Sequence, residues 1–427
     1  MRACHPRRAA HCAAREGDPC VSVLRKTGTP GSPSPRFARP GRTVWLVAAL
    51  LFASPTIAAP PSPCAYLAAQ IDAAPSGPIF LASYPETSTR ELKDAAFVYD
   101  NAVAVTALVG CNEIPRARRI GDALLFALDH DRFWHDGRLR NAYLAGAVTN
   151  PVKLPGWWDT QQNGWAEDRY QVGSDTGNLA WAMLALLALD RVTNDPRYRA
   201  GAARIGTWLR TLDNRGGTVG GEPKPDVLRW SSTEHNIDLA GAYTALAATT
   251  GDPRWRNDAR KAASFVQSMW SDDGAYFQGG LREDDVTREP LLALDVQVWS
   301  LLAIPAARPH QQALLTTIER LARGGGYTYA DGGQVMWTEG TAQAALLFAL
   351  MGDGKKAAAL SRTLRTMRDA NGGYLAAPAP LGTNLSVEGD TAQMRYYYRT
   401  PHLAAAAWAA LAERRFNPFT GTQALPR

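Results

Sequence analysis

Two stretches of the chain decide the fold: "TNDPRYRAGAARIGTWLRTL" at 193–212 and "TGDPRWRNDARKAASFVQSM" at 250–269 align without a gap. In each, apolar residues recur at alternating intervals of four and three, the period of an amphipathic helix with one wet face. Asp195 and Asp252 stand where an N-cap belongs, and each is followed by a Pro at the first helical position. The two stretches are therefore predicted to be copies of one helical unit. Looser copies begin at Pro115, Pro309 and Gly354.

A second kind of segment precedes each copy. Runs such as "NLAWAMLALLAL" from Asn178 and "AQAALLFALM" from Ala342 are apolar on all sides, which predicts helices buried all round. Five of these inner helices are followed by an amphipathic outer helix, and the N-terminal "CAYLAAQIDA" at 64–73 could be the partner of the sixth. The six inner helices are expected near 97–109, 175–189, 236–249, 293–304, 338–351 and 401–413.

Self-similarity with a period of tens of residues indicates a repeat architecture. An open solenoid is one possibility, but the pairing of wholly apolar helices with amphipathic ones favours an inner and an outer ring. The fold is therefore predicted to be all-α, an (α/α)6 toroid of helical hairpins with long Gly- and aromatic-rich loops at one mouth. Residues 60–427 are expected to form this single barrel domain.

The first 59 residues have a different character. They hold nine Lys and Arg against two acids, a charge of +7, which leaves −1 of the total +6 for the rest of the chain and disfavours nucleic acid as a partner. Arg36, Arg39 and Arg42 precede the apolar "VWLVAALLFA" and a run of small residues, the layout of a secretory signal. The apolar run falls short of the roughly 20 residues that span a bilayer. We expect a leader at 1–59, periplasmic or secreted localisation and no membrane span.

Two cysteines, Cys64 and Cys111, remain beyond the leader. An even pair in a chain bound for an oxidising compartment fits one disulfide. Two buried thiols are the alternative, and the sequence leaves both open.

Carboxylates mark the starts of the inner helices. In "WSSTEHNIDLAGAY" at 230–243, Ser231 and Glu234 have the spacing of a capping box, but Glu234 could equally be a catalytic acid. Acids favour helix N-termini, so any one of them could be only a cap. Five around one mouth predict a site. The other four are Asp100, Asp175, Asp295 and Glu339.

Aromatic residues lie close to these acids. Rings beside carboxylates and amides suit a sugar, which has apolar C–H faces and hydroxyl edges, so a carbohydrate is the expected partner. Trp181 and Trp299 lie inside inner helices and are better placed for the core. The residues expected to bind substrate are Tyr99, Trp157, Trp158, Trp230, His235, Asn236, Asp295, Trp337 and Tyr398.

Common signatures of other chemistries do not occur beyond the leader. The chain has no GxSxG, Walker, CxxC or HExxH pattern there. His235 and His402 are the only histidines near the mouth, and a single His at a helix start is more often structural than a metal ligand. We expect no metal and no cofactor.

Four stretches resemble secreted bacterial members of the six-hairpin glycosidase-like superfamily, which contains α/α-toroid glycoside hydrolases and some lyases. These stretches are "WSSTEHNIDL", "LDVQVWSLLA", "TEGTAQAALL" and "PHLAAAAWAALAERRFNPF". The similarity covers roughly residues 94–419. It implies the toroid fold and a glycan-active protein, and it does not assign individual residues.

The residues at the mouth are consistent with an inverting glycoside hydrolase on a neutral glycan. That reaction needs one protonated carboxyl as acid and one ionised carboxylate as base, about 6.5–9.5 Å apart. Glu234 is the expected acid, because Trp230 and the apolar run beside it could raise its pKa. Asp100 is preferred as base over Asp175 and Glu339, because Tyr99 can orient water or substrate nearby.

Two alternatives remain. A lyase or epimerase on a uronate would use Tyr, His or Arg, and Arg395 and Tyr396–Tyr398 at the sixth inner helix could supply them. A mouth rich in acids repels uronates, which favours neutral glycans. A non-catalytic glycan-binding toroid in polysaccharide export would keep the aromatic residues but need no matched pair of carboxyls.

Overall fold

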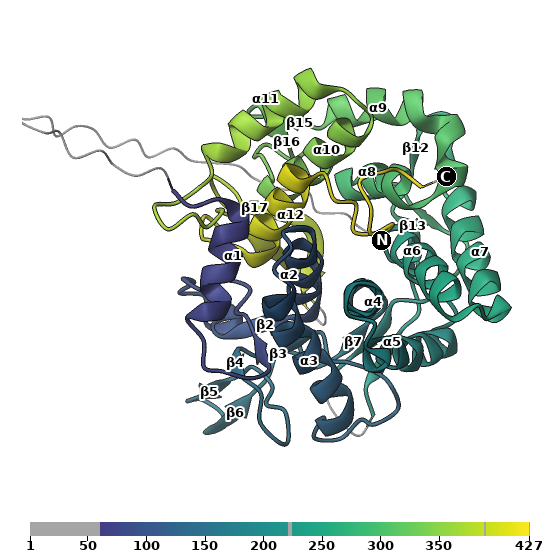
Figure 1. Ribbon diagram of the computed structural model, residues 1–427. Helices are drawn as coiled ribbons and strands as arrows, with labels where there is room; N and C mark the ends of the chain where they lie inside the picture. The colour runs from purple at the N-terminus through teal and green to yellow at the C-terminus, as the bar shows by residue number, and fades with distance from the viewer. Residues whose placement is uncertain (1–59, 221–223, 388–389, 427) are drawn as a thin grey trace, which may run out of the picture. The chain divides into compact units, whose positions relative to one another are not determined.

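The computed structural model describes residues 60–220, 224–387 and 390–426 (Figure 1). The leader and its predicted signal peptide lie outside the described residues. The described part contains twelve α-helices, joined by loops with short antiparallel strands. None of its helices is both long and apolar enough to cross a membrane.

The inner helices are the even-numbered ones, and they form near the predicted positions. Each packs against the next along the chain, and the last returns to pack against the first, so their contacts follow a closed circle. α4 illustrates their character, since nearly every residue from Thr176 to Asp190 is buried. The six are α2 (Val98–Gly110), α4 (Thr176–Thr193), α6 (Thr233–Thr250), α8 (Leu294–Ala303), α10 (Thr338–Leu350) and α12 (Leu403–Arg414).

The outer helices are the odd-numbered ones, and in Figure 1 they lie outside the even-numbered helices. Each buries one stripe; on α7 it consists of Trp255, Ala259, Ala262 and Val266, four of the five positions that the sequence period predicts. α1 contacts α12 and α2 and is the outer partner of the sixth inner helix, as expected. The six are α1 (Pro63–Asp72), α3 (Ile114–His130), α5 (Pro196–Leu209), α7 (Pro253–Ser268), α9 (Gln311–Arg320) and α11 (Gly354–Arg365).

The N-caps of the two repeated outer helices are confirmed. Asp195 and Asp252 each accept a hydrogen bond from the backbone N–H two residues on, at 3.1 and 2.9 Å. Both are followed by the predicted Pro at the first helical position.

The capping box predicted at the start of α6 is wrong. The N-cap is Ser232, whose hydroxyl accepts from the backbone N–H of His235 at 3.3 Å. Ser231 lies one residue earlier in a short strand, where it pairs with Leu281. His235 therefore occupies the position that would close a capping box, and Glu234 does not.

Short antiparallel strands fill the loops, and three of them, β2, β7 and β10, lead directly into α2, α4 and α6. These sheets therefore lie at the N-terminal ends of inner helices. The pairs are β1 (Ile79–Phe80) with β4 (Gly146–Ala147), β2 (Ala95–Phe97) with β3 (Ala142–Leu144), β5 (Trp157–Asp159) with β6 (Gly164–Ala166), β11 (Trp270–Ser271) with β12 (Tyr276–Phe277), β15 (Ala322–Arg323) with β16 (Gly326–Tyr327) and β17 (Leu381–Val387) with β18 (Asp390–Tyr397). The three-stranded sheets are β7 (Ser174–Asp175), β8 (Gly217–Val219) and β9 (Asp226–Leu228), and β10 (Ser231–Ser232), β13 (Gly280–Leu281) and β14 (Arg288–Glu289).

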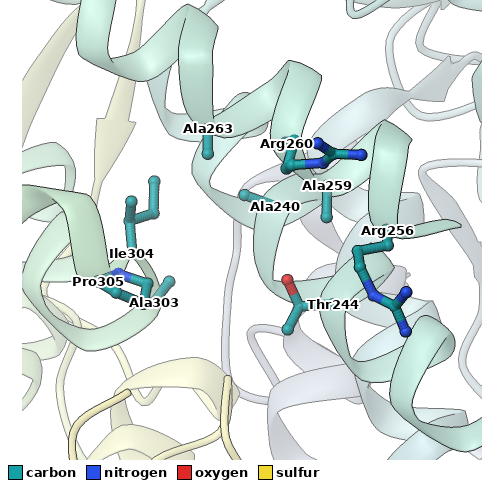
Figure 2. A pocket seen from close by; sticks show the side chains of 9 residues that line it. All are labelled: Ala240, Thr244, Arg256, Ala259, Arg260, Ala263, Ala303, Ile304 and Pro305. Atoms are coloured by element: carbon teal, nitrogen blue, oxygen red, sulfur yellow. The ribbon is translucent and has the colours of Figure 1, made fainter. Parts of the chain in front are cut away.

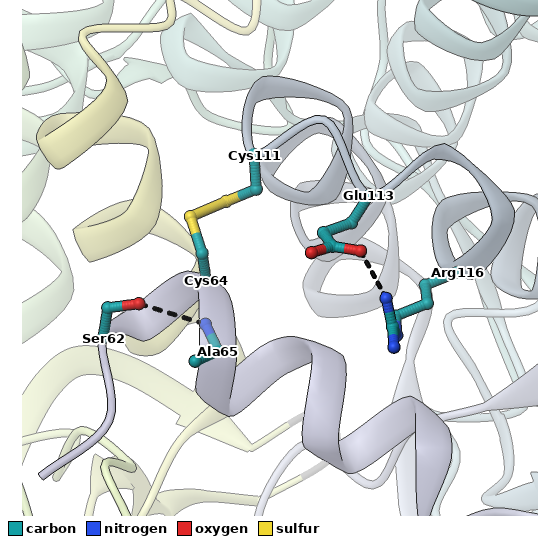
Figure 3. Close-up of a disulfide and its surroundings, with 6 residues drawn as sticks. All are labelled: Ser62, Cys64, Ala65, Cys111, Glu113 and Arg116. Carbon is teal, nitrogen blue, oxygen red and sulfur yellow. Dashed lines mark hydrogen bonds and ion pairs between the residues drawn. A yellow bond between two sulfur atoms is a disulfide. The ribbon is translucent and has the colours of Figure 1, made fainter.

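A disulfide joins α1 to the end of α2. Cys64 lies in the first turn of α1 and Cys111 directly follows α2, with their Cα atoms 5.9 Å apart (Figure 3). Of the two states that the sequence left open, the structure contains the bridge. It ties the N-terminal helix to the first hairpin.

The C-terminal tail packs at the opposite end from the helix starts. The ring of Phe416 lies against Gly110 at the end of α2. Phe419 packs against Trp181 and Trp299, with ring centroids 5.1 and 5.9 Å apart. Asn417 is fully buried and donates to the carbonyl of Leu302 near the end of α8 at 2.9 Å. Phe419 also lies against Gly241 of α6, so the tail contacts four inner helices, α2, α4, α6 and α8.

Candidate active site

The five predicted acids gather at one end of the inner helices. Glu234, Asp295 and Glu339 are the second residues of their helices, Asp100 is the third residue of α2, and Asp175 is the N-cap of α4. Four of them are at most 4% exposed, whereas Glu234 keeps more of its surface accessible. Glu234 is therefore the acid most open to a ligand.

Glu234 is surrounded by other acids. Burial raises its pKa well above the ordinary value, and the charges of Asp295, Asp238, Asp175 and Glu339 raise it further. A carboxyl that lines a concave site can be crowded by protein atoms while part of the residue stays accessible. These surroundings favour the protonated form of Glu234, the form that can donate a proton.

Glu339 belongs to a hydrogen-bonded chain that crosses the site. The hydroxyl of Tyr99 donates to one of its carboxylate oxygens, and the indole N–H of Trp408 donates to Tyr99 at 2.9 Å. Gln343 also donates to Glu339, at 3.3 Å. Burial raises the pKa of Glu339 to about 7, although His402 and the Tyr99 hydrogen bond oppose the shift. Glu339 is thus held in place and only partly ionised near neutral pH.

His402 lies between two of the acids, at the start of α12. Its Nε2 is 3.2 Å from Asp100 Oδ2, and its Nδ1 is 3.7 Å from Glu339 Oε2. Its ring stacks on Tyr84 with centroids 4.5 Å apart. Burial alone would lower the pKa of His402, but the nearby charges of Asp100 and Glu339 raise it above the usual value. His402 is therefore a buried base that faces two carboxyls and can form an ion pair with Asp100 when it is protonated.

The sequence reasoning placed His402 near the mouth but did not include it in the site. A signal was present: His402 is the N-cap of the sixth inner helix, and each of the other five carries an acid at its N-cap or in its first turn.

Asp175 and Asn236 have structural partners. One oxygen of Asp175 accepts from the backbone N–H groups of Gly177 and Asn178 at 2.8 and 3.4 Å, so it caps α4. His235 Nε2 lies 3.4 Å from the same oxygen. Asn236 is fully buried and donates to the carbonyl of Ser232 at 2.8 Å. Asp175 and Asn236 hold the helix starts that frame the site.

Asp295 also bonds to its own helix. One of its oxygens accepts from the N–H of Val296 at 2.7 Å, and burial raises the pKa of Asp295 to about 7. It was predicted to bind substrate, yet only 3% of its surface is exposed. Asp295 influences the site through its charge, which raises the pKa of both Glu234 and Asp238.

Three tryptophans form a buried floor under the acids. Trp181, Trp299 and Trp408 come from α4, α8 and α12, with ring centroids 5.3 to 5.8 Å apart. Tyr99 lies against this cluster, 5.4 Å from Trp181. Trp181 and Trp299 are core residues, as expected; Trp408 was missed because the Ala-rich helix around it gives no sign of a site.

Trp337 is also buried, at 2% exposure, although it was predicted to contact substrate. Its ring packs on Tyr329 and Tyr397, at 5.1 and 5.4 Å. Trp337 therefore supports the two tyrosines and offers almost no surface to a ligand.

The remaining aromatic residues lie in the loops. Trp158 on β5 is 57% exposed, and its neighbour Trp157 packs under the Arg90 guanidinium at 4.7 Å. Trp230 is partly exposed and lies 5.3 Å from His235. Of these, Trp230 has a ring contact with a residue beside Asp175, whereas Trp158 stands on an exposed hairpin.

The tyrosine run lies just before the sixth inner helix. Tyr396 and Tyr397 end β18, and Tyr398 follows that strand, whereas α12 begins at Leu403, two residues after the expected start at residue 401. Tyr398 is partly exposed, and its ring lies 6.2 Å from Tyr396.

A separate pocket lies between α6, α7 and the end of α8 (Figure 2). None of the five acids lines it, and two arginines of α7 give it the opposite charge. It is therefore distinct from the candidate site. Its lining consists of Ala240, Thr244, Arg256, Ala259, Arg260, Ala263, Ala303, Ile304 and Pro305.

Among the residues that the structure describes, no group of three or more His, Cys, Asp and Glu side chains is arranged to hold a metal ion. The acids at the mouth are thus spread around the site.

Several solved structures share the fold of this chain. No family model and no curated protein matches the chain. Among solved structures, a glycosidase variant in complex with glucose is 15% identical, with a TM-score of 0.59 over 83% of this chain and 95% of that one. An alpha-amylase from Clostridium perfringens is 11% identical, with a TM-score of 0.59 over 83% and 97%. Cellobiose 2-epimerase from Bacillus thermoamylovorans is 14% identical, with a TM-score of 0.52 over 82% and 95%. The chain shares its fold with these three solved structures.

Proposed function

We propose that residues 60–427 form an (α/α)6 toroid that acts on carbohydrate in the periplasm or outside the cell, and that it is an inverting glycoside hydrolase. Its fold likeness to glycosidases supports the class of substrate. The observation that carries the reaction is Glu234, an accessible carboxyl that burial and neighbouring acids keep protonated. A protonated carboxyl beside an ionised one is what glycoside hydrolysis needs.

Asp100 is the base in this proposal. Its Oδ2 lies 3.2 Å from His402 Nε2, while Asp175 is committed to capping α4. Glu339 is the weaker choice, because a pKa of about 7 leaves it partly protonated near neutral pH.

The chemical step is a single displacement. Asp100 takes a proton from water as the water oxygen bonds to the anomeric carbon. The glycosidic bond to the leaving oxygen breaks, and Glu234 gives that oxygen its proton. The leaving group departs as a neutral alcohol, and the new hydroxyl has inverted configuration.

The site favours a neutral glycan. Five acids lie close enough together that their charges raise the pKa values of Glu234 and Asp238, and such a cluster repels a uronate. The five are Glu234, Asp238, Asp295, Asp175 and Glu339. Loop aromatic residues such as Trp230 are suited to the apolar faces of sugar rings.

The test is a reducing-end assay over neutral α- and β-glucans, galactans and mannans, with NMR of the first anomer formed. Release of reducing ends with inversion supports the proposal, and Asp100→Asn should abolish it. Asp190→Asn is a matched control, because Asp190 is a buried acid on α4 far along the helix from Asp175. Release with retention contradicts the mechanism. Binding without release favours a glycan-binding toroid.

A sugar epimerase is the second candidate, and His402 is the observation that favours it. A buried histidine between Asp100 and Glu339 can move a proton at a sugar carbon. A sugar epimerase occurs among the proteins of this fold. An epimerase would produce a new disaccharide and incorporate deuterium from D2O at carbon without releasing reducing ends.

A further inference from the structure

Asp238 is the most deeply buried acid beside Glu234. It lies one turn further along α6, at the i,i+4 spacing that puts two side chains on one face of a helix. It is 1% exposed, and neither of its oxygens has a hydrogen-bond partner in the described part of the chain. A buried carboxylate without donors is costly, so Asp238 and the carboxyl beside it have a strong reason to retain one proton between them.

Acids and one indole face Asp238 and Glu234 from the neighbouring elements. Burial raises the pKa of Asp238 well above its ordinary value, and the charges of Asp295 on α8 and Asp175 at the start of α4 raise it further. The indole N–H of Trp181 on α4 opposes this shift, without the geometry of a hydrogen bond.

Glu234 experiences the same charges, together with those of Asp238 and of Glu339 on α10. Two histidines contact these acids: His235 Nε2 lies 3.4 Å from Asp175, and His402 Nδ1 lies 3.7 Å from Glu339. No basic side chain within the described residues forms an ion pair with Asp238 or Glu234.

We propose that Asp238 is a positioning residue for the proton of the general acid. As the buried neighbour of Glu234, it keeps the proton of the pair on Glu234, the carboxyl that faces substrate. The inference rests on the proposed function of Glu234. Two facing carboxyls in a dry site cannot both ionise, so one proton remains on the pair across the working pH range. Since Glu234 is the accessible member, its proton is the one that can reach a leaving oxygen.

The test is the pH profile of kcat/KM for Asp238→Asn. Removing the negative charge beneath Glu234 makes Glu234 a stronger acid, so the alkaline limb should move to lower pH by about one unit. The acid limb, set by the base, should stay in place. Asp190→Asn is the buried control and should leave both limbs unchanged. A profile that overlays the wild-type profile overturns the proposal.

Thermal unfolding gives a second readout that does not need activity. The folded state raises the pKa of Asp238, so this group destabilises the fold increasingly as pH rises above its unfolded value. Asp238→Asn should therefore melt near the wild-type temperature at pH 4 and above it at pH 8. A pH-independent difference contradicts the inference, even if activity is lost.

The two failures can be told apart. If Glu234→Gln keeps normal turnover, the proposed function fails. If Glu234→Gln is inactive but Asp238→Asn shows neither the shifted limb nor the pH-dependent melting, only the role of Asp238 fails.

Discussion

Single residues at the helix starts separate capping from chemistry. One carboxylate oxygen of Asp175 accepts a hydrogen bond from the backbone of α4, and Asp295 accepts one from the first turn of its own helix. At α6 the N-cap is Ser232, one residue after Ser231, which the sequence favours. Glu234 is thereby free of the capping role. A sequence with consecutive serines cannot decide between them, because both pair with β13 and the cap depends on where the helix begins, at Thr233.

We expect Glu234→Gln to lower turnover on a natural glycan by roughly 10² to 10⁴, because Gln cannot donate a proton. Substrates with an activated leaving group should suffer much less. The measurement is kcat on both kinds of substrate. Ser232→Ala is the control: it removes the cap of α6, should cost about 1 kcal/mol of stability, and should spare the chemistry. Near-normal turnover of Glu234→Gln would rule out the acid role.

A buried ion pair fixes the loop before the site. The carboxylate of Asp131 binds the guanidinium of Arg140 through two hydrogen bonds at 2.8 Å. Arg140 also donates to the carbonyl of Val172, and Asn141 beside it accepts from the N–H of Asp175. Burial would raise the pKa of Asp131, but the Arg140 hydrogen bonds and charge hold it below its ordinary value.

Asp131→Asn should destabilise the protein by about 3–5 kcal/mol near neutral pH, because it removes the carboxylate charge that faces the buried guanidinium of Arg140. In the wild type this contribution is present above the unfolded pKa of Asp131 and is lost as pH falls through its lowered folded pKa. The difference in free energy of unfolding between the two proteins should therefore shrink towards acidic pH. Denaturant titrations at several pH values measure it.

At the scale of elements, the helices could be predicted from the sequence and the loops could not. The Asp–Pro starts and the apolar period located α5 and α7 to within a few residues. Strands of two or three residues, such as β7 and β10, carry no detectable period. The site residues His402 and Asp238 depend on how helix starts meet in space, which a local pattern does not contain.

The β5–β6 hairpin is the loop element most exposed to a polymer. Trp158 pairs across it with Trp165, and the two are 57% and 58% exposed on the same face. We expect Trp158→Ala to raise KM for a polysaccharide about tenfold, while kcat on a short activated substrate stays unchanged. Val286→Ala is the control, because Val286 is also exposed, at 79%, in another loop. An unchanged KM would place the hairpin outside the binding surface.

For the molecule as described from residue 60 to residue 426, the inner helices contact one another in a closed circle. The first helix and the C-terminal tail of this range both pack against that circle. α1 packs on α12 and α2, while the tail brings Phe416 and Phe419 against the ends of the inner helices. The fold could be read from the repeat because each hairpin carries the same pattern. The closing contacts could only be suggested, because α1 and the tail are single segments without a second copy for comparison.

The disulfide is the covalent link in this closed arrangement. The bond between Cys64 and Cys111 links residues 47 apart in sequence, and the constraint that it places on the unfolded chain should stabilise the fold by about 4 kcal/mol. Replacing both cysteines with Ala should lower the melting temperature by many degrees while leaving activity at low temperature intact, since neither sulfur lies among the acids. Thiol titration of the unfolded, unreduced protein should find no free thiol from this pair. Two free thiols in exported protein would contradict the bridge, and an unchanged melting temperature would show that packing of α1 alone closes the circle.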